Sequence, residues 1–489
     1  MEITAVHEGL SSTDRICGRS DELRRLQALL DSANPEFLAV YGRRRVGKTF
    51  LIREFFAPRT TFFELTGRID GTLEEHLRAF GRALEEAFGH RAGRSVPTSW
   101  NEAFQQLWDA VERQRRAKKK VVLFFDELPW LATRRSSCLR ELEYFWNRYA
   151  SRDPRVILVV CGSAAAWMIQ KIVRARGGLH NRLTATIRLM PFTLSEARTF
   201  LEARGHRTTT NQVAELHMAL GGIPHYLNLV DPSESAAQNI ERLFFSASGP
   251  LRFEFEDVFR SLFDDGDHHR HIVELLARHR GGVPLKDLLE RAEVPVGGTS
   301  VRVVEALDEA GFISVDVPFG RTSRDRRVRL TDELSLFALR WMKGDRRRRR
   351  WAQIRGTPEW RTWAGLAFES MCLRHVFAIE RALGISGVYV EPSPWAKTGE
   401  GGAQIDLLLD RADDVISVCE LKYTDAPFVI TKAYATALRH KLDVFRQTTG
   451  TRKALRLVLV SAQGLKTNKW STGLVDAVVT LEDLVVEAR

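Results

Sequence analysis

The sequence has few of the features that mark secreted, disulfide-bonded or membrane proteins. Its 489 residues include only five cysteines and no C-x-x-C pair. This usage excludes a disulfide framework or a structural zinc site and is typical of a reducing compartment. No apolar segment follows the N-terminus, so we expect no signal peptide. The uncharged apolar run of residues 156–169 is interrupted by Gly162-Ser163 and is too short to cross a bilayer. We therefore expect a cytoplasmic protein.

The sequence has fewer acidic than basic residues. The chain has 73 Lys and Arg against 62 Asp and Glu, which gives a formal net charge of +11 and a pI near 9.6. This surplus favours an anionic partner, most simply nucleic acid. The chain is too long for one hydrophobic core, so about three or four domains are expected.

A glycine-rich segment follows the apolar strand pattern of residues 37–41. It fits G-x-x-x-x-G-K-[ST] at every fixed position, and the apolar helix pattern of residues 50–56 follows it. Such a loop turns backbone N–H groups toward phosphate oxygens, and the next helix N-terminus favours the anion. Lys48 would neutralise the β- and γ-phosphates, and the Thr49 hydroxyl would bind Mg²⁺. The predicted nucleotide-binding residues here are Gly42, Arg43, Arg44, Arg45, Val46, Gly47, Lys48 and Thr49.

Two acidic residues follow the wholly apolar run 121–125. Such a run suits a parallel strand buried on both faces, and ligands bind at the carboxyl ends of such strands. Asp126 would hold Mg²⁺, and Glu127 would orient or deprotonate the attacking water. The alternative is an acidic N-cap of the next helix, but the nearby phosphate loop favours catalysis.

Ser163 ends a second strand pattern, residues 156–162. It could act as a sensor that contacts the γ-phosphate or the water, or it could cap a helix over residues 164–173, and both alternatives stay open. Arginines follow at positions 174, 176 and 182. One of them could stabilise the transition state at a neighbouring subunit's nucleotide, and we select Arg182. This role would require a homo-oligomer.

The order of these motifs resembles that of the AAA+/STAND-type ATPases of archaea and bacteria, over about the first half of the chain. The series is Gly18-Arg19, the phosphate loop, Asp126-Glu127, Cys161-Gly162-Ser163, Arg182 and Gly221-Gly222-Ile223-Pro224. The resemblance implies ATP and Mg²⁺ as cofactors. It also implies that Gly18, Arg19 and Pro224 belong to the nucleotide site, with Pro224 in a helical lid. The residues alone indicate a helix C-cap followed by a proline stop, and both interpretations can hold together.

The middle of the chain changes from helices to a mixed pattern. Residues 194–263 have apolar groups at helical spacing, which suits an ATPase lid. Three short helices, 272–277, 285–292 and 300–310, then precede two strands, 311–317 and 326–330. This order predicts a winged helix, which would contact DNA or a protein. Its wing has arginines that suit phosphate contacts, at positions 321, 324, 326, 327 and 329.

Two further clusters have competing interpretations. His268, His269 and His271 follow aspartates, but neighbouring residues of a helix do not face each other, so an acidic helix start is preferred to a metal site. The arginines at 346–350 precede Trp351 and predict a linker. That run would be a solvated tail, or the tryptophan would stack on a base.

Glu369 interrupts an apolar stripe on the helix predicted over residues 363–381. The stripe consists of Leu366, Cys372, Leu373, Val376 and Phe377. A buried carboxylate needs a cation, a proton or hydrogen bonds. Two predicted strands, 405–409 and 415–422, offer Asp406, Glu420 and Lys422, and turn residues between them predict a hairpin. A loop of odd length would place Asp406 opposite Glu420, whereas an even one would separate their faces.

Three carboxylates in one place repel unless a divalent cation joins them. We therefore predict that Glu369, Asp406 and Glu420 bind Mg²⁺ or Mn²⁺. Lys422 would orient or deprotonate the water, or stabilise the charge of the transition state. The set resembles the PD-(D/E)XK nucleases, which combine a helix glutamate, a strand aspartate and E-x-K. The resemblance covers about the last quarter of the chain, and Asp406 departs from it because Gln404-Ile405 precedes it instead of proline.

The predicted fold class is α/β, with five segments. They are a P-loop ATPase core with a parallel sheet (1–192), a helical lid (193–264), a winged-helix domain (265–345), a basic linker (346–362) and a restriction-endonuclease-like α/β domain (363–489). We expect an ATP-binding and ATP-hydrolysing protein coupled to a metal-dependent nuclease that acts on nucleic acid, with DNA favoured. The alternative is a signalling or scaffold ATPase whose nuclease-like domain binds nucleic acid or a partner without cleaving.

Overall fold

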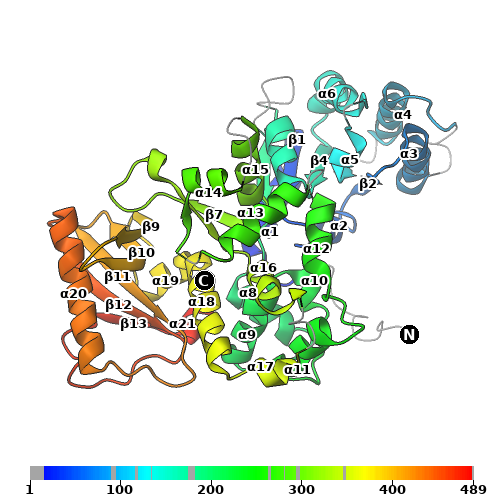
Figure 1. Ribbon diagram of the computed structural model, residues 1–489. Helices are drawn as coiled ribbons and strands as arrows, with labels where there is room; N and C mark the ends of the chain where they lie inside the picture. Colours follow the sequence, from blue (N-terminus) through cyan, green and yellow to red (C-terminus); the bar gives the residue numbers. More distant parts are fainter. Residues whose placement is uncertain are drawn as a thin grey trace. The chain divides into compact units, whose positions relative to one another are not determined.

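The computed structural model describes residues 16–89, 95–115, 119–133, 135–173, 182–262, 266–279, 281–292, 298–344 and 349–486 (Figure 1). The chain forms two compact units, Met1–Met190 and Pro191–Arg489. Within the described ranges, no helix is both long and apolar enough to span a bilayer. Arg174 and Arg176 lie outside these ranges, as do residues 346–348 of the arginine run.

A parallel five-stranded sheet is the centre of the first unit. It consists of β1 (Glu36–Tyr41), β2 (Thr61–Thr66), β3 (Val121–Asp126), β4 (Val156–Gly162) and β5 (Ala185–Arg188). The order is β2-β3-β4-β1-β5, and every neighbouring pair is parallel. Every residue of β3 and β4 is buried, as their wholly apolar sequences predict. The predicted parallel α/β sheet is therefore confirmed.

Helices and short turns complete this unit. The elements are α1 (Ser20–Asp31), α2 (Lys48–Phe56), α3 (Leu73–Phe88), α4 (Trp100–Arg113), α5 (Leu128–Leu131), α6 (Cys138–Arg148), η2 (Ala150–Arg152), α7 (Ala165–Met168) and η3 (Ile169–Val173). Thr72 and Glu75 form a capping box that starts α3. Aromatic rings of α3, α4 and α6, including Phe80, Phe104 and Phe145, pack in the core beside the sheet. Each buried ring contributes roughly 1.5–3 kcal/mol.

The second unit begins with helices. They are α8 (Leu194–Glu202), α9 (Thr210–Leu220), α10 (Pro224–Leu227), α11 (Ala236–Ile240), the π-turn η4 (Glu241–Phe245) and α12 (Glu254–Leu262). Gly221 ends α9 in the left-handed conformation, and Pro224 starts α10. The predicted helix C-cap and proline stop are thus confirmed. Gly222 must be glycine as well, because a Cβ there would lie 2.2 Å from the Phe192 carbonyl oxygen.

A small antiparallel sheet with three helices follows. Its elements are α13 (Gly266–Leu276), β6 (Val283–Pro284), α14 (Leu285–Arg291), α15 (Gly298–Glu309), β7 (Ile313–Asp316), η5 (Ser323–Asp325) and β8 (Arg327–Leu330). The strand order is β6-β8-β7. The predicted order of three helices and two strands is present, with β6 in addition. Arg321, Arg324 and Arg326 are exposed, but Arg329 is buried, so its predicted place on an exposed wing is wrong.

In the segment predicted as a linker, the described residues 349–362 contribute buried side chains to the core. After α16 (Glu333–Trp341) come α17 (Trp351–Ile354), α18 (Pro358–Arg374) and α19 (Val376–Ala382). Trp351 is fully buried, with its ring 5.3 Å from Phe337 and 5.9 Å from Trp363. It therefore cannot stack on a base, which corrects that alternative. The helix predicted over 363–381 starts earlier and breaks at His375, so Phe377 is exposed instead of continuing an apolar stripe.

A mixed sheet forms the C-terminal part. It contains β9 (Val390–Lys397), β10 (Ala403–Arg411), β11 (Val415–Lys422), β12 (Ala454–Ser461) and β13 (Ala477–Val479), with α20 (Lys432–Thr449) and α21 (Leu481–Leu484). The order is β13-β12-β11-β10-β9, antiparallel from β9 to β11 and parallel from β11 to β13. Helix α20 and helix α18 lie on either side of this sheet (Figure 1). This arrangement is compatible with the predicted C-terminal α/β domain.

Candidate nucleotide and carboxylate sites

The glycine-rich loop joins β1 to α2 in a conformation that its sequence dictates. Gly42, Arg45 and Gly47 have φ angles of 147°, 72° and 90°. A Cβ on Gly42 would lie 2.2 Å from the Leu189 carbonyl oxygen, so only glycine fits there. Arg43 and Val46 are buried, and Arg44 and Arg45 are half-buried. The loop therefore closes over the end of β1 and leads directly into the first turn of α2.

Lys48 lies inside this loop. Its side chain is only 5% exposed, and its Nζ donates hydrogen bonds of 3.0 Å to the carbonyl oxygens of Gly42 and Arg43. An ammonium group held at the centre of a turn of backbone amides is placed to neutralise a bound phosphate.

Thr49 and Asp126 meet at the next position. The Thr49 hydroxyl at the start of α2 donates a 2.7 Å hydrogen bond to Oδ2 of Asp126 at the end of β3. A hydroxyl and a carboxylate side by side are the oxygen ligands that Mg²⁺ prefers. This pair of residues thus fits a magnesium ion bound with nucleotide phosphates.

Glu127 and Ser163 are joined across the ends of β3 and β4. The backbone N–H and the hydroxyl of Ser163 donate to Oε2 of Glu127 at 3.0 and 2.9 Å. Helix α7 has Ala164 as its N-cap residue and no side-chain cap, so Ser163 does not cap it. Glu127 itself has a φ of 47°, a strained conformation for a non-glycine residue. The acid is therefore fixed by its neighbour strand.

Four other predicted residues have differing surroundings. Arg19 is buried, has a φ of 63° and donates through Nη2 to the Val46 carbonyl oxygen at 3.2 Å, so it ties the start of α1 to the phosphate loop. Gly18 precedes it with a φ of 66°. Arg182 is exposed just before β5. Pro224 belongs to the second unit, where it begins α10.

Comparison with known proteins decides the class of the first site. Residues 17–230 match a family described as an ATPase domain predominantly from Archaea. This segment contains a P-loop ATPase domain. A curated but uncharacterized protein of Methanocaldococcus jannaschii is 22% identical over 264 residues, or 53% of each chain. The chain thus spans about half the length of the curated relative that it matches.

Two solved structures are similar at a lower level. A Walker-type ATPase of Pyrococcus abyssi is 19% identical with a TM-score of 0.49, over 66% of this chain and 96% of that one. The ORC2 protein of Aeropyrum pernix, solved as ADPNP and ADP complexes, is 17% identical with a TM-score of 0.39, over 66% and 92%. The family match supports ATP hydrolysis as an activity of the ATPase domain.

Outside the ATPase domain, the predicted carboxylates lie on β10, β11 and α18. Leu407 pairs with Cys419 and Leu408 with Val418, so the loop that joins the two strands has odd length. The paired residues end at Leu407, one position before Asp406 and Glu420 would face each other. The pairing of β10 with β9 shifts between Ile405 and Leu408, which is a β-bulge at Asp406. The odd-length loop was one of the two predicted alternatives. A bulge of this kind re-aims a side chain and is frequent beside functional sites.

Glu369 and Asp406 interact directly. Burial and the neighbouring Asp406 carboxylate raise the pKa of Glu369 to about 7, while Arg329 and Lys422 act in the opposite direction. Gln404 donates a 2.7 Å hydrogen bond to Oδ1 of Asp406. Helix α18 therefore delivers Glu369 to the bulged position of β10.

Glu420 has different partners. The Lys422 and Lys441 ammonium groups lie 2.8 and 2.6 Å from its two oxygens, and the Tyr434 hydroxyl donates to it. Burial opposes ionisation, but Lys441 and Lys422 lower the pKa of Glu420 to about 2. Partial burial would lower the pKa of Lys422, yet the ion pair with Glu420 raises it. Lys422 is therefore a cation and does not suit the predicted role of a base.

The predicted set of three metal-binding carboxylates is not assembled. Among the residues that the structure describes, no three His, Cys, Asp or Glu side chains are grouped so that they could hold a metal ion. Glu369 and Asp406 are together, whereas Glu420 is paired with lysines. Sequence reasoning missed Tyr434 and the ion pair of Lys441. The only signal for them is the basic character of α20, which contributes both residues.

Proposed function

We propose that this protein hydrolyses ATP at its phosphate loop and uses its C-terminal sheet to bind and cleave nucleic acid, with DNA favoured. The contact between Glu369 and Asp406, with Lys422 beside them, carries the second half of this proposal. Two neighbouring carboxylates repel each other, and a bound cation would offset that repulsion. A pair of acids beside a lysine is also an arrangement that suits the cleavage of phosphodiesters.

In the ATPase domain, the contacts of Lys48, Thr49 and Glu127 support the roles predicted for them. Lys48 would bind the β- and γ-phosphates in place of the loop carbonyl groups. Thr49 and Asp126 would hold Mg²⁺, which neutralises developing phosphate charge when bound. Glu127 would orient or deprotonate the attacking water, with Ser163 as its positioning residue. Arg182 would act at a neighbouring subunit, and Gly18 and Arg19 would complete the nucleotide site.

In the C-terminal site, the residues fit a cation only in part. Glu369 and Asp406 supply two oxygen ligands, and a bound Mg²⁺ or Mn²⁺ would polarise a phosphodiester and lower the pKa of water. Lys422 would stabilise the negative charge of the transition state, because its ammonium group stays protonated. Glu420 would become a ligand of the cation only if it first lost its ion pair with Lys422 or Lys441.

The exposed arginines between β7 and β8 support nucleic acid as the partner. Arg321, Arg324 and Arg326 lie on one connection and are exposed. Arginines in such a loop can pair with backbone phosphates, and each such contact would add about 0.9 to the salt dependence of binding.

A second candidate function is binding without cleavage. It is favoured by the three donors on Glu420, since an acid paired in this way is also typical of a structural ion pair. A partner protein or an uncut nucleic acid would then be held by an ATP-dependent scaffold.

Cleavage assays separate these two functions. Wild type should cut single- or double-stranded DNA or RNA with Mg²⁺ or Mn²⁺, and Lys422→Ala and Glu369→Gln should each lose about 100-fold or more of that activity. Both variants should keep ATP hydrolysis. Arg439→Ala, which changes an exposed arginine of α20, is the matched control. Absence of cleavage by wild type under all these conditions would favour the scaffold.

Binding of the cation can be tested by thermal unfolding, which does not depend on catalysis. Addition of Mn²⁺ to metal-free wild type should raise its unfolding temperature, and Glu369→Gln should abolish that increase. An equal increase in both proteins would place the cation elsewhere, at the ATPase domain or at the surface.

A further inference from the structure

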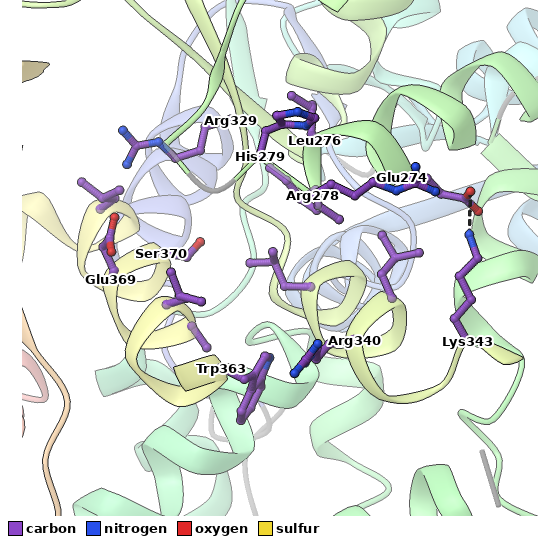
Figure 2. A pocket seen from close by; sticks show the side chains of 17 residues that line it. Glu274, Leu276, Arg278, His279, Arg329, Arg340, Lys343, Trp363, Glu369 and Ser370 are labelled. Atoms are coloured by element: carbon purple, nitrogen blue, oxygen red, sulfur yellow. Dashed lines mark hydrogen bonds and ion pairs between the residues drawn. The ribbon is translucent and has the colours of Figure 1, made fainter. Parts of the chain in front are cut away.

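A cavity of about 700 Å³ lies within the second unit, between α13, β8, α16 and α18. Figure 2 shows Arg329 and Glu369 at one end of it and the ion pair of Lys343 with Glu274 at the other. This volume is within the range of about 300–1,000 Å³ that small-molecule sites occupy. The cavity is large enough for an organic ligand.

The lining combines apolar side chains with charged and polar ones. Side chains from all four elements contribute to it, among them Leu276, Leu330, Leu339 and Leu366. Apolar walls with a few polar groups are typical of sites for organic molecules, because burial of the apolar body supplies affinity and the polar groups supply orientation.

Arg329 is the polar group that lacks a partner. Arg329 is 8% exposed, and its Nε and Nη1 atoms are buried without an acceptor among the described residues. Glu369 influences it electrostatically, but the structure shows no ion pair between them among these residues. A buried guanidinium without acceptors is costly, and its fork of N–H groups matches phosphate or carboxylate oxygens.

A second donor in the lining is also without an acceptor. Trp363 is 4% exposed, and its indole Nε1 is buried with no hydrogen-bond partner in the described part of the chain. Because both of these groups are donors, the missing partner must supply acceptors, and Arg329 favours a negative charge on it.

We propose that this cavity binds a small organic phosphate with an apolar body, of the size of a nucleoside monophosphate, and that the phosphate pairs with Arg329. The apolar part lies against the leucines of α16 and α18. This site is separate from the phosphate loop, which belongs to the first unit. It shares Glu369 with the carboxylate site, but the proposal does not depend on nuclease activity.

Binding is tested on the full chain with Lys48→Ala, so that the phosphate loop contributes little. AMP, GMP, CMP and UMP are titrated separately by calorimetry in metal-free buffer. At least one should bind, and Arg329→Met should weaken it about 10-fold or more, as expected for loss of a charged hydrogen bond. Arg439→Met, at an exposed position of α20, should leave the affinity unchanged. Failure of all four to bind, or equal binding to Arg329→Met, would overturn the proposal.

Two further comparisons exclude trivial outcomes. Inorganic phosphate should bind at least about 10-fold more weakly than the nucleotide, because it lacks the apolar body. Equal affinity would reject an organic ligand. A short DNA strand that binds through Arg329 when the mononucleotides do not would reject the small molecule in favour of nucleic acid.

The folding of the variants provides its own control. Without ligand, Arg329→Met should unfold at the same temperature as wild type or higher, because the change removes a buried charge without a partner. A clear decrease would mean that Arg329 stabilises the fold and would contradict the proposal. Leu339→Trp, which fills the cavity and leaves Arg329 in place, should also abolish binding.

Discussion

The phosphate loop and the C-terminal carboxylate site differ in where their partners come from. Lys48 bonds to carbonyl groups of its own loop, and Thr49, Asp126 and Glu127 meet at the ends of adjacent elements. In the second site, α18 supplies Glu369, β10 supplies Asp406, and α20 supplies the lysine and tyrosine on Glu420. The first site is centred on one loop and on the ends of neighbouring parallel strands, which short sequence patterns predict. The second site draws on four elements and depends on how the whole domain packs.

The largest expected effect concerns the first of these sites. Lys48→Ala should reduce ATP hydrolysis by roughly 1,000-fold, because no other residue of the loop supplies a buried ammonium group. The change is checked by phosphate release, with Lys119→Ala, an exposed lysine of the same unit, as the control. Turnover that stays unchanged would show that the nucleotide binds elsewhere.

The next effect separates the acid from its positioning residue. Glu127→Gln should lower kcat about 100-fold or more while nucleotide affinity is kept, because the amide cannot accept the proton of the water. Ser163→Ala should lower kcat less, by about 10-fold, since it removes only the hydroxyl contact to Glu127. An equal loss in both variants would indicate that Ser163 contacts the nucleotide or water itself.

Two buried histidines in the second unit, His217 and His375, should make the stability of the protein depend on pH. His375 accepts a hydrogen bond from the Leu194 N–H through Nε2 and donates through Nδ1 to the Met371 carbonyl oxygen, so it is neutral. Burial lowers the pKa of His217 and of His375 from 6.5 to about 4. The unfolded chain therefore binds more protons between pH 6.5 and 4, and stability should fall as the pH decreases through this range.

The expected loss is roughly 2 kcal/mol per histidine at pH 5 relative to pH 7.5. His217→Gln cannot titrate, so its stability should depend less on pH than that of wild type. His440→Gln, at an exposed position of α20, should behave like wild type. Thermal unfolding at the two pH values provides the measurement, and parallel curves for wild type and His217→Gln would contradict the interpretation.

The smallest effect tests whether Glu420 depends on α20. Lys441→Met leaves this buried acid with Lys422 and Tyr434 and should destabilise the protein by about 1–2 kcal/mol at pH 7. Arg439→Met is the control on the same helix. No change in the unfolding temperature would mean that the ion pair with Lys441 is not needed, which would make Glu420 more available to a cation.

Sequence patterns predicted the parts of the fold that depend on short stretches. The wholly apolar runs became β3 and β4, and Gly42 stands where a left-handed turn and a close carbonyl group demand glycine. Strand β9 was missed because it contains Pro392 and Pro394, which the edge of the sheet tolerates but an inner strand does not.

The carboxylate site was predictable only in part, because charge partners came from distant positions. Lys441 lies 21 residues from Glu420 in the sequence, and only the packing of α20 on the sheet brings them together. Trp351 follows a run of arginines, so the sequence suggested that its ring could stack on a base. In the structure the ring packs against aromatic residues that precede and follow it in the sequence. Such partners depend on tertiary packing that no local motif encodes.

The bulge in β10 interrupts the regular pairing of β9 with β10 at the position of Asp406. A redesign that restores regular pairing would therefore alter the surroundings of this residue. Deletion of Leu407 would let β9 and β10 pair evenly along their length. The same deletion would shift Asp406 one place against β11 and change its position relative to Glu369 and Glu420. A sheet with even strand pairing would therefore lack the arrangement of Glu369 and Asp406 on which the proposed function depends.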